Sequence, residues 1–278
     1  MSSPDASYPF LKGHGTENDF VLLPDHDCSV HGDLPAERVR ALCDRRAGIG
    51  GDGVLRVVRS SHSSDGGAEW FMDYRNSDGS ISEMCGNGVR VFGRHLAEQG
   101  LVDPSAPVPV ATRAGIKVLS FAGGTADGEI TVDMGIPKVL EQTEVSIDGR
   151  TWSALHVDMG NPHAVAFVDD LADVGHLLDA PVHDPGVYPH GVNVEFVVRR
   201  GPRHVAMRVH ERGSGETRSC GTGACAVMVA TALADDADRD TDYRIDLPGG
   251  TLRISWTAED RVLMTGPAVV VASGTTDL

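Results

Sequence analysis

The chain has 278 residues, of which 41% are hydrophobic and 23% charged, so it carries enough apolar side chains to fold as one or two globular domains. Its formal net charge of −16 repels phosphate backbones and anionic lipid headgroups, which argues against nucleic acid and membrane partners. The N-terminal stretch lacks a basic cluster followed by an apolar run, and no segment approaches a bilayer-spanning length, so we expect a cytoplasmic protein.

The first half of the chain alternates strand-like and helix-like segments that end at glycine-rich turns. We expect strands at 20–24, 53–60 and 69–76, and helices at 35–48 and from residue 86 to about Gly100. The glycine-rich stretch 122–129 is a turn, and it marks a plausible domain boundary.

The second half is richer in strands. The expected strands lie at 129–135, 153–160, 164–170, 192–200, 204–212, 243–248, 251–257 and 261–274. One helix is expected directly after Cys220. The two predicted domains are therefore 1–124 and 125–265, and the C-terminal segment 266–278 is expected to return to the first domain.

Two cysteines introduce helices in the same way, half a chain apart. Cys-Gly-Asn-Gly at 85–88 aligns with Cys-Gly-Thr-Gly at 220–223, which predicts a duplicated architecture, with a chance match as the alternative. The other three cysteines, Cys28, Cys43 and Cys225, are expected to be small buried apolar groups. The odd number of cysteines indicates a reducing compartment, and their spacing does not fit a zinc site.

A thiol at a helix N-terminus lies next to free backbone N–H groups and the positive end of the helix dipole. We therefore expect a lowered thiol pKa at both positions. Two such thiols suit the inversion of a stereocentre, because one removes a proton from one face of a carbon and the other delivers a proton to the opposite face. The four backbone donors of two helix starts would supply at most about 12 kcal/mol toward stabilising the charged transition state. The residues alone then require no pyridoxal cofactor.

Some patterns allow ordinary structural explanations. "GIGGDG" at 48–53 fits the dinucleotide fingerprint Gly-x-Gly-x-x-Gly, but a helix precedes it and a strand follows, so a tight turn is the better interpretation. Asn161 and His163 in "GNPHAV" fit either an Asn-Pro turn with a packed imidazole or a ligand site. Asn18 and Asn193 border apolar runs, where an unpaired amide is costly.

The motifs together resemble those of the diaminopimelate epimerase family. The similarity rests on "NSDGSISEMCGNGVR" (76–90), and on 13–23, 47–53, 159–165, 192–197 and 211–224, in the order of that family. It implies an α/β (α+β) fold of two pseudo-symmetric domains, each a barrel-like, mostly antiparallel sheet around a central helix, with the active site in the interdomain cleft. It also implies a pyridoxal-independent homodimer that interconverts LL- and meso-2,6-diaminopimelate in lysine and peptidoglycan precursor synthesis.

The resemblance assigns roles to residues that match the motifs of the family. Cys85 would be the base toward the LL isomer and Cys220 the base toward the meso isomer. Backbone N–H groups of Gly86, Asn87, Gly221 and Thr222 would hold the reacting carboxylate, and Glu211 the reacting amino group. The remaining substrate contacts would come from Asn18, Asn76, Asn161, Asn193 and Arg212.

One residue departs from the family pattern, because Gly53 stands where many members carry Gln. Three other functions stay open at this stage. The first is proline or hydroxyproline racemisation, which would not need the extra amide and guanidinium side chains of Asn76, Asn161, Asn193 and Arg212. The second is a thiol redox switch with a reversible Cys85–Cys220 disulfide. The third is amino acid binding without turnover.

Overall fold

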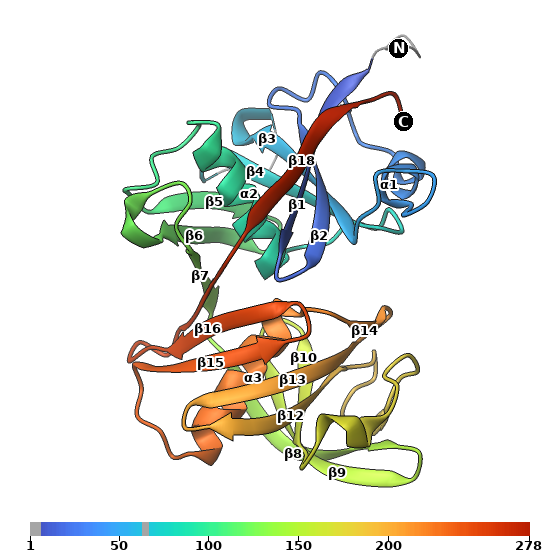
Figure 1. The fold of residues 1–278 in the computed structure, drawn as a ribbon, viewed down its shortest axis with the longest axis vertical. Helices are drawn as coiled ribbons and strands as arrows, with labels where there is room; N and C mark the ends of the chain where they lie inside the picture. The colour runs from blue at the N-terminus through green and yellow to red at the C-terminus, as the bar shows by residue number, and fades with distance from the viewer. Residues whose placement is uncertain (1–6, 63–66) are drawn as a thin grey trace. The chain divides into compact units, whose positions relative to one another are not determined.

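The computed structural model describes residues 7–62 and 67–278, and it has the mixed α/β, strand-dominated architecture that we expected (Figure 1). The chain divides into two compact units. The N-terminal unit runs to Val132 and includes Pro267–Leu278, and the C-terminal unit is Asp133–Gly266. This division at 132/133 lies a few residues beyond the expected domain boundary at 124/125. Within the described residues, no helix is long and apolar enough to cross a membrane.

The sheet of the N-terminal unit includes a strand from the far end of the chain. In chain order its strands are β1 (Tyr8–Gly15), β2 (Asn18–Pro24), β3 (Gly53–Arg59), β4 (Trp70–Asn76), β5 (Val108–Thr112), β6 (Gly115–Phe121), the first half of β7 (Ile130–Gly135) and β18 (Val269–Thr276). β18 pairs antiparallel with β1, so the C-terminal segment lies beside the first strand (Figure 1). The order is β18-β1-β2-β3-β4-β5-β6-β7, with parallel pairs only at β2–β3 and β4–β5.

The C-terminal unit repeats this order. Its strands are β8 (Lys138–Ile147), β9 (Arg150–Asp158), β10 (Pro162–Phe167), β12 (Asn193–Gly201), β13 (His204–Glu211), β15 (Thr241–Leu247), β16 (Gly250–Trp256) and β17 (Val262–Gly266), with the short strands β11 (Val182–His183) and β14 (Gly215–Thr217). They pair in the order β8-β9-β10-β12-β13-β15-β16-β17, and the parallel pairs β10–β12 and β13–β15 fall at the same places. The two units therefore share one topology.

Each unit holds one long helix against the inner face of its sheet. α2 (Gly86–Glu98) contacts β1 to β5 and β18, and α3 (Gly221–Ala234) contacts β9, β10, β12, β13 and β15 to β17 (Figure 1). Every residue of α2 except Glu98 is buried. A helix surrounded by strands must have apolar side chains on all sides, or polar side chains whose hydrogen bonds are satisfied within the protein. This explains why the residues of α3 are almost all small or aliphatic.

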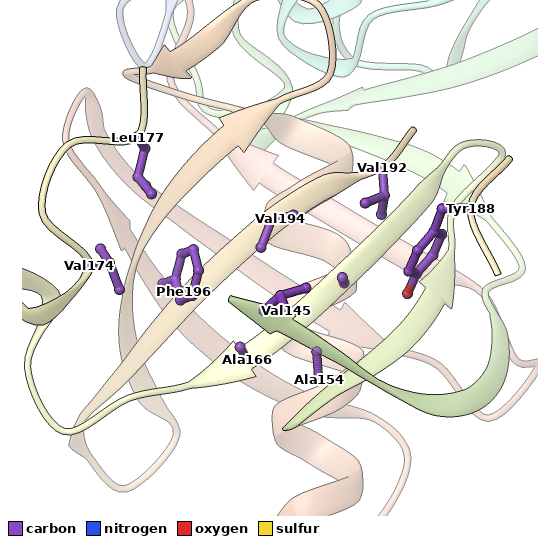
Figure 2. Close-up of a cluster of buried hydrophobic side chains, with 10 residues drawn as sticks. Val145, Ala154, Ala166, Val174, Leu177, Tyr188, Val192, Val194 and Phe196 are labelled. Carbon is purple, nitrogen blue, oxygen red and sulfur yellow. The ribbon is translucent and has the colours of Figure 1, made fainter. Parts of the chain in front are cut away.

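The outer face of each sheet is covered differently. In the N-terminal unit, α1 (Ala36–Cys43) packs Val39 and Leu42 onto Val21, Leu23 and Val54. In the C-terminal unit, the connection between β10 and β12 supplies the cover. Figure 2 shows Val174, Leu177, Tyr188 and Val192 of this connection beside the strand residues Val145, Ala154, Ala166, Val194 and Phe196. Because side chains alternate along a strand, Val194 and Phe196 face this cover and Glu195 faces α3.

Several elements differ from the sequence-based expectation. The helix expected at 35–48 ends at Cys43, because Asp44 is extended and its carboxylate accepts the N–H groups of Arg46 and Ala47. β1, β5, β6 and β8 were not anticipated. More than half of the residues in β1 and in β8 are not buried, so neither of these two shows a clear alternation. Short 3-10 helices occur at Ser60–His62, Ala122–Gly124 and Leu171–Val174.

Candidate active site

The two cysteines at the helix starts are N-caps. Cys85 and Cys220 have extended backbones, and each sulfur accepts the backbone N–H three residues on, from Gly88 at 3.4 Å and from Gly223 at 3.3 Å. A thiol thus takes the position that Ser, Thr, Asp or Asn ordinarily occupies. The predicted equivalence of the two motifs holds in the structure, since α2 follows β4, α3 follows β13 and the short β14, and β4 and β13 have the same place in the two strand orders.

In the N-terminal unit, Asn18 links the cysteine to the helix. The Cys85 thiol donates to Asn18 Oδ1 at 3.6 Å, and Asn87 Nδ2 donates to the same oxygen at 3.1 Å. The Asn18 amide in turn donates to Asp52 Oδ2 at 2.7 Å. Asn18, Cys85 and Asn87, with Gly86 between the last two, therefore form one cluster.

Asp52 belongs to a charged group that sequence reasoning missed. Arg45 bonds both Asp52 Oδ1, at 2.8 Å, and Asp19 Oδ1, at 2.6 Å. Burial raises the pKa of Asp52, and the negative charge of Asp19 acts in the same direction, while the Asn18 hydrogen bond opposes them. Only the position of Asp52 inside the glycine-rich turn could have signalled its role.

Arg90 was also not singled out, although it ends the family-like motif. Its side chain is completely buried, and Nη2 donates to Asn87 Oδ1 at 2.9 Å. The two residues are one helical turn apart, so the guanidinium fixes which end of the Asn87 amide faces Asn18.

Asn76 and Gly53 are paired across β3 and β4. The Asn76 amide donates to Ser80 Oγ at 2.9 Å, so its described side-chain bond leads to the following turn and not to the cysteine cluster. A Cβ on Gly53 would lie 2.5 Å from the Arg75 carbonyl oxygen and 2.7 Å from the Tyr74 ring. Glycine at this position is therefore required by close packing, which gives a physical reason for the departure from the family Gln.

In the C-terminal unit a second cluster surrounds Cys220. Asn161 Nδ2 donates to Thr222 Oγ1 at 3.4 Å, and this hydroxyl lies 3.6 Å from the Cys220 sulfur. His163, which the sequence left undecided, contacts Asn161 Oδ1 through Nε2 at 3.1 Å. Asn161 thus takes part in a side-chain network, which goes beyond a simple Asn-Pro turn.

The remaining predicted residues of this unit lie at the end of β13. Asn193 Oδ1 accepts the backbone N–H of Arg212 at 2.9 Å, and its amide donates to the Pro162 carbonyl oxygen at 3.3 Å. The Glu211 carboxylate accepts the Thr217 hydroxyl. The Arg212 guanidinium donates to the His190 carbonyl oxygen at 3.3 Å. Both costly amides, Asn18 and Asn193, therefore have partners.

The expectation of a lowered thiol pKa is wrong for Cys220. Burial raises its pKa well above the ordinary value, because the thiolate loses contact with water, and the carboxylates of Glu211 and Glu195 add to the effect. The Thr222 hydroxyl and the Gly223 N–H oppose the shift but do not overcome it. All five cysteines are free thiols. Within residues 7–62 and 67–278, no group of three or more His, Cys, Asp or Glu side chains could hold a metal ion.

The strand registers show which predicted residues occupy equivalent positions in the two units. Phe20 lies beside Gly53 in the parallel pair β2–β3, and His163 lies beside Asn193 in the pair β10–β12. By this register Asn18 corresponds to Asn161, Gly53 to Asn193, and Cys85 to Cys220. Gly53 is paired with Asn76 of β4, and because Val194 is paired with His210, the same register continued by one residue sets Asn193 opposite Glu211 of β13.

The sequence as a whole matches one family. A sequence model described as diaminopimelate epimerase matches residues 10–140 and 155–271. The chain belongs to the diaminopimelate epimerase family. Among the curated members it is 58% identical to the diaminopimelate epimerase of Streptomyces coelicolor over 280 residues, covering 96% of this chain and 95% of that protein. It is 48% identical to that of Rhodococcus jostii, covering 96% of both, and 45% identical to that of Corynebacterium glutamicum strain ATCC 13032, covering 96% and 97%.

Solved structures show the same fold outside the diaminopimelate epimerase family. A Bacillus anthracis phenazine biosynthesis protein of the PhzF family superposes with a TM-score of 0.68 at 16% identity, covering 98% of this chain and 99% of that one. A hydroxyproline epimerase from Agrobacterium vitis, with bound trans-4-hydroxy-L-proline, also gives 0.68 at 16% identity, covering 98% and 93%. These likenesses confirm the two-domain, barrel-like architecture, and this chain, as a member of its family, is an isomerase.

Proposed function

We propose that this protein interconverts LL- and meso-2,6-diaminopimelate by proton transfer at one α-carbon, with Cys85 and Cys220 as the two bases and without pyridoxal phosphate. The observation that carries the proposal is the pair of thiol caps at equivalent places in two units of one topology. Family membership and the identity of up to 58% with curated diaminopimelate epimerases support the substrate.

The chemistry follows from the two caps. A thiolate at one cysteine removes the α-proton, and the thiol of the other delivers a proton to the opposite face, so the carbon inverts and the proton count is unchanged. The carboxylate of the substrate gains charge in the transition state. Backbone N–H groups of Gly86, Asn87, Gly221 and Thr222, in the first turns of the two helices, are the donors that we assign to it.

We assign the rest of the substrate to polar side chains around each cap. Glu211 takes the reacting amino group, and the backbone of Arg212 assists it. Recognition of the remaining groups falls to Asn18, Asn76, Asn161, Asn193 and the Arg212 side chain. Amides can both donate and accept, so they suit an ammonium and a carboxylate at once, and a guanidinium can hold a carboxylate with two donors.

A deuterium experiment tests the function. The protein is incubated with LL-diaminopimelate in deuterium oxide, and deuterium at one α-carbon is followed by mass spectrometry with chiral separation. We expect incorporation and epimerisation by the wild type and loss of epimerisation in Cys85→Ala and in Cys220→Ala. Cys225→Ala, on the same helix as the second cap but fully buried, is the matched control and keeps turnover. Full turnover by either cap variant overturns the two-base assignment.

Parallel incubations separate the alternative substrates. Exchange on proline or hydroxyproline with none on diaminopimelate would replace the proposed substrate, and binding without α-proton exchange would rule out catalysis. We also propose a cytoplasmic homodimer, which the family resemblance implies. Light scattering coupled to gel filtration checks the dimer, and a monomeric mass with full activity contradicts it.

A further inference from the structure

Two fully buried, ionisable side chains have no role in the proposed chemistry. His163 on β10 and Glu195 on β12 are both 0% exposed, with Nδ1 and Oε1 2.7 Å apart. Within the described residues Oε2 of Glu195 has no hydrogen-bond partner, so His163 is the main stabilising contact of this carboxylate. A Cβ on Gly223 would lie 2.6 Å from Glu195 Oε1, which places the pair against the first turn of the helix that Cys220 caps.

The N-terminal unit fills the same two positions with apolar residues. By the shared strand registers, His163 corresponds to Phe20 and Glu195 to Leu55. Leu55 and Phe20 also contact the equivalent helix glycine, because a Cβ on Gly88 would lie 3.2 Å and 3.5 Å from them. The fold therefore packs this place well without charges. Since burying an ion pair costs several kcal/mol per ion before the pairing is counted, the His–Glu pair needs a reason beyond packing.

The hydrogen bonds of the pair run in one direction, toward Cys220. His163 Nε2 lies 3.1 Å from the Asn161 carbonyl oxygen, which can only accept, so Nε2 carries a proton. A further proton then lies between Nδ1 and the Glu195 oxygen. With its oxygen engaged by His163, Asn161 donates from Nδ2 to Thr222 Oγ1. The Thr222 hydroxyl accepts that bond and lies 3.6 Å from the Cys220 sulfur, so its own proton is available to a thiolate there.

The equivalent asparagine of the N-terminal unit points the other way. Asp52 accepts from the Asn18 amide, so the Asn18 oxygen faces Cys85 and accepts the thiol proton. One carboxylate thus turns an acceptor toward Cys85, and the other, acting through an imidazole and Asn161, leaves the Thr222 hydroxyl as a donor beside Cys220. An acceptor favours the thiol form and a donor favours the thiolate.

We propose that Glu195, acting through His163, is a positioning residue that orients the Asn161 amide toward the Thr222 hydroxyl, so that this hydroxyl donates to the Cys220 sulfur and favours its thiolate. The inference rests on the proposed function in taking Cys220 as one of the two bases. The groups that oppose the thiolate are burial, the Glu211 carboxylate on β13 and the charge of Glu195 itself. The Thr222 donor offsets part of this cost, and the proton that Glu195 shares with His163 offsets the charge of Glu195.

The test replaces the His–Glu pair with the apolar residues found at the equivalent positions of the N-terminal unit. The double variant Glu195→Leu/His163→Phe carries the residues of the N-terminal unit, and Glu195→Gln is the conservative variant. Thermal unfolding establishes that each variant is folded. The readouts are the pH profile of kcat/KM on diaminopimelate and, in protein with ¹⁵N-labelled histidine at pH 7, the ring nitrogens of His163, assigned by their absence from the double variant.

We expect a proton on Nε2 of His163 in the wild type, because this nitrogen donates to the Asn161 carbonyl oxygen. In the double variant the acid limb of kcat/KM should move upward by about one pH unit, which is roughly a tenfold loss at a fixed pH on that limb. Glu195→Gln should shift the acid limb less. The Gln amide can donate to Nδ1, so Nε2 keeps its proton and its hydrogen bond to the Asn161 carbonyl oxygen.

Three results would overturn the proposal. They are an Nε2 without a proton on wild-type His163, an unchanged pH profile in the folded double variant, and a downward shift of the acid limb, which would mean that Glu195 acts only as a negative charge near the sulfur. The ring measurement does not need turnover. Failure of the proposed function, seen as no exchange on diaminopimelate by the wild type, is therefore distinguishable from failure of this inference.

Discussion

Arg90 holds the Asn87 carboxamide from the next turn of the same helix, with 2.9 Å between Nη2 and Oδ1, and its side chain has no exposed surface. A buried guanidinium with a fixed hydrogen-bond geometry orients its partner more strictly than a flexible ammonium does. The orientation of Asn87 determines what its amide presents to Asn18, and hence the surroundings of Cys85.

We therefore expect Arg90→Lys to lower kcat/KM by roughly tenfold to a hundredfold, because Lys keeps the charge but loses the planar donor set, at a cost of about 1–3 kcal/mol. Arg40→Lys is the matched control, since Arg40 is exposed on α1 and bonds only the Asp78 carbonyl oxygen among its described partners. Steady-state kinetics with both variants decide the matter. Wild-type kinetics in Arg90→Lys would show that Asn87 is oriented by other contacts.

The ionisation of Cys220 should respond to Glu211. Burial is the main cause that raises the pKa of this thiol, and the Glu211 carboxylate raises it further, so removing the charge should lower the pH at which the thiolate forms. In protein labelled with ¹³C at the cysteine Cβ, the Cys220 resonance of Glu211→Gln should titrate at lower pH than in the wild type. Glu216→Gln is the control, because its carboxylate is paired with Arg208. An upward shift in Glu211→Gln would contradict this electrostatic account.

Acid should destabilise the protein through His95 of α2. Burial lowers the pKa of His95 to about 4, and neither ring nitrogen has a hydrogen-bond partner in the described residues. The unfolded chain binds the proton near pH 6.5 and the native state only near pH 4. The contribution of neutral His95 to the free energy of unfolding should therefore be fully present above pH 6.5. It should fall by about 3 kcal/mol as the pH is lowered toward 4.

Urea titrations at pH 7 and pH 4.5 check this prediction. His95→Leu should remove much of the drop, and the exposed His176→Leu should leave it unchanged. His31, whose pKa burial also lowers to about 4, should keep a drop of the same sign in both variants. Equal acid sensitivity in His95→Leu and the wild type would exclude His95 as a cause.

Gly13 allows β1 to pack closely on the central helix. A Cβ there would lie 2.7 Å from Val91 Cγ1 of α2 and 2.9 Å from the Val269 carbonyl oxygen of β18. Gly13→Ala should lower the free energy of unfolding by about 1–3 kcal/mol, because the backbone oxygen cannot move without breaking the sheet. Gly201→Ala is the control, since no heavy atom lies within 4 Å of its added Cβ. Equal denaturation midpoints for both variants would contradict the close packing.

Restoring the family Gln at position 53 should not restore a contact. Because the first side-chain atom would already overlap the Arg75 carbonyl oxygen, Gly53→Gln should be less stable than the wild type and less active. Gly53→Ala should show most of the loss of stability, because it brings the same clash without the amide. Thermal unfolding and kinetics measure both effects. A Gln variant that is as stable as the wild type and more active would mean that the strands open to accept it.

The amino-acid sequence by itself determined the local features of this protein. An N-cap needs only its own helix, since Cys85 bonds the N–H of Gly88 and Cys220 that of Gly223, so the motif alone places both thiols. The buried strands β3, β4, β12 and β13 were likewise predicted to within a residue, because each is a continuous run of apolar or alternating residues that is independent of its neighbours.

The tertiary structure decided the partners of these elements. Asp52 reaches Asn18, and Glu195 reaches His163, only because parallel strands bring together segments more than thirty residues apart along the chain. No periodicity encodes such a register. The raised pKa of Cys220 has the same origin, because a helix start favours a thiolate locally, whereas burial and the facing carboxylates, which reverse that preference, exist only in the folded chain.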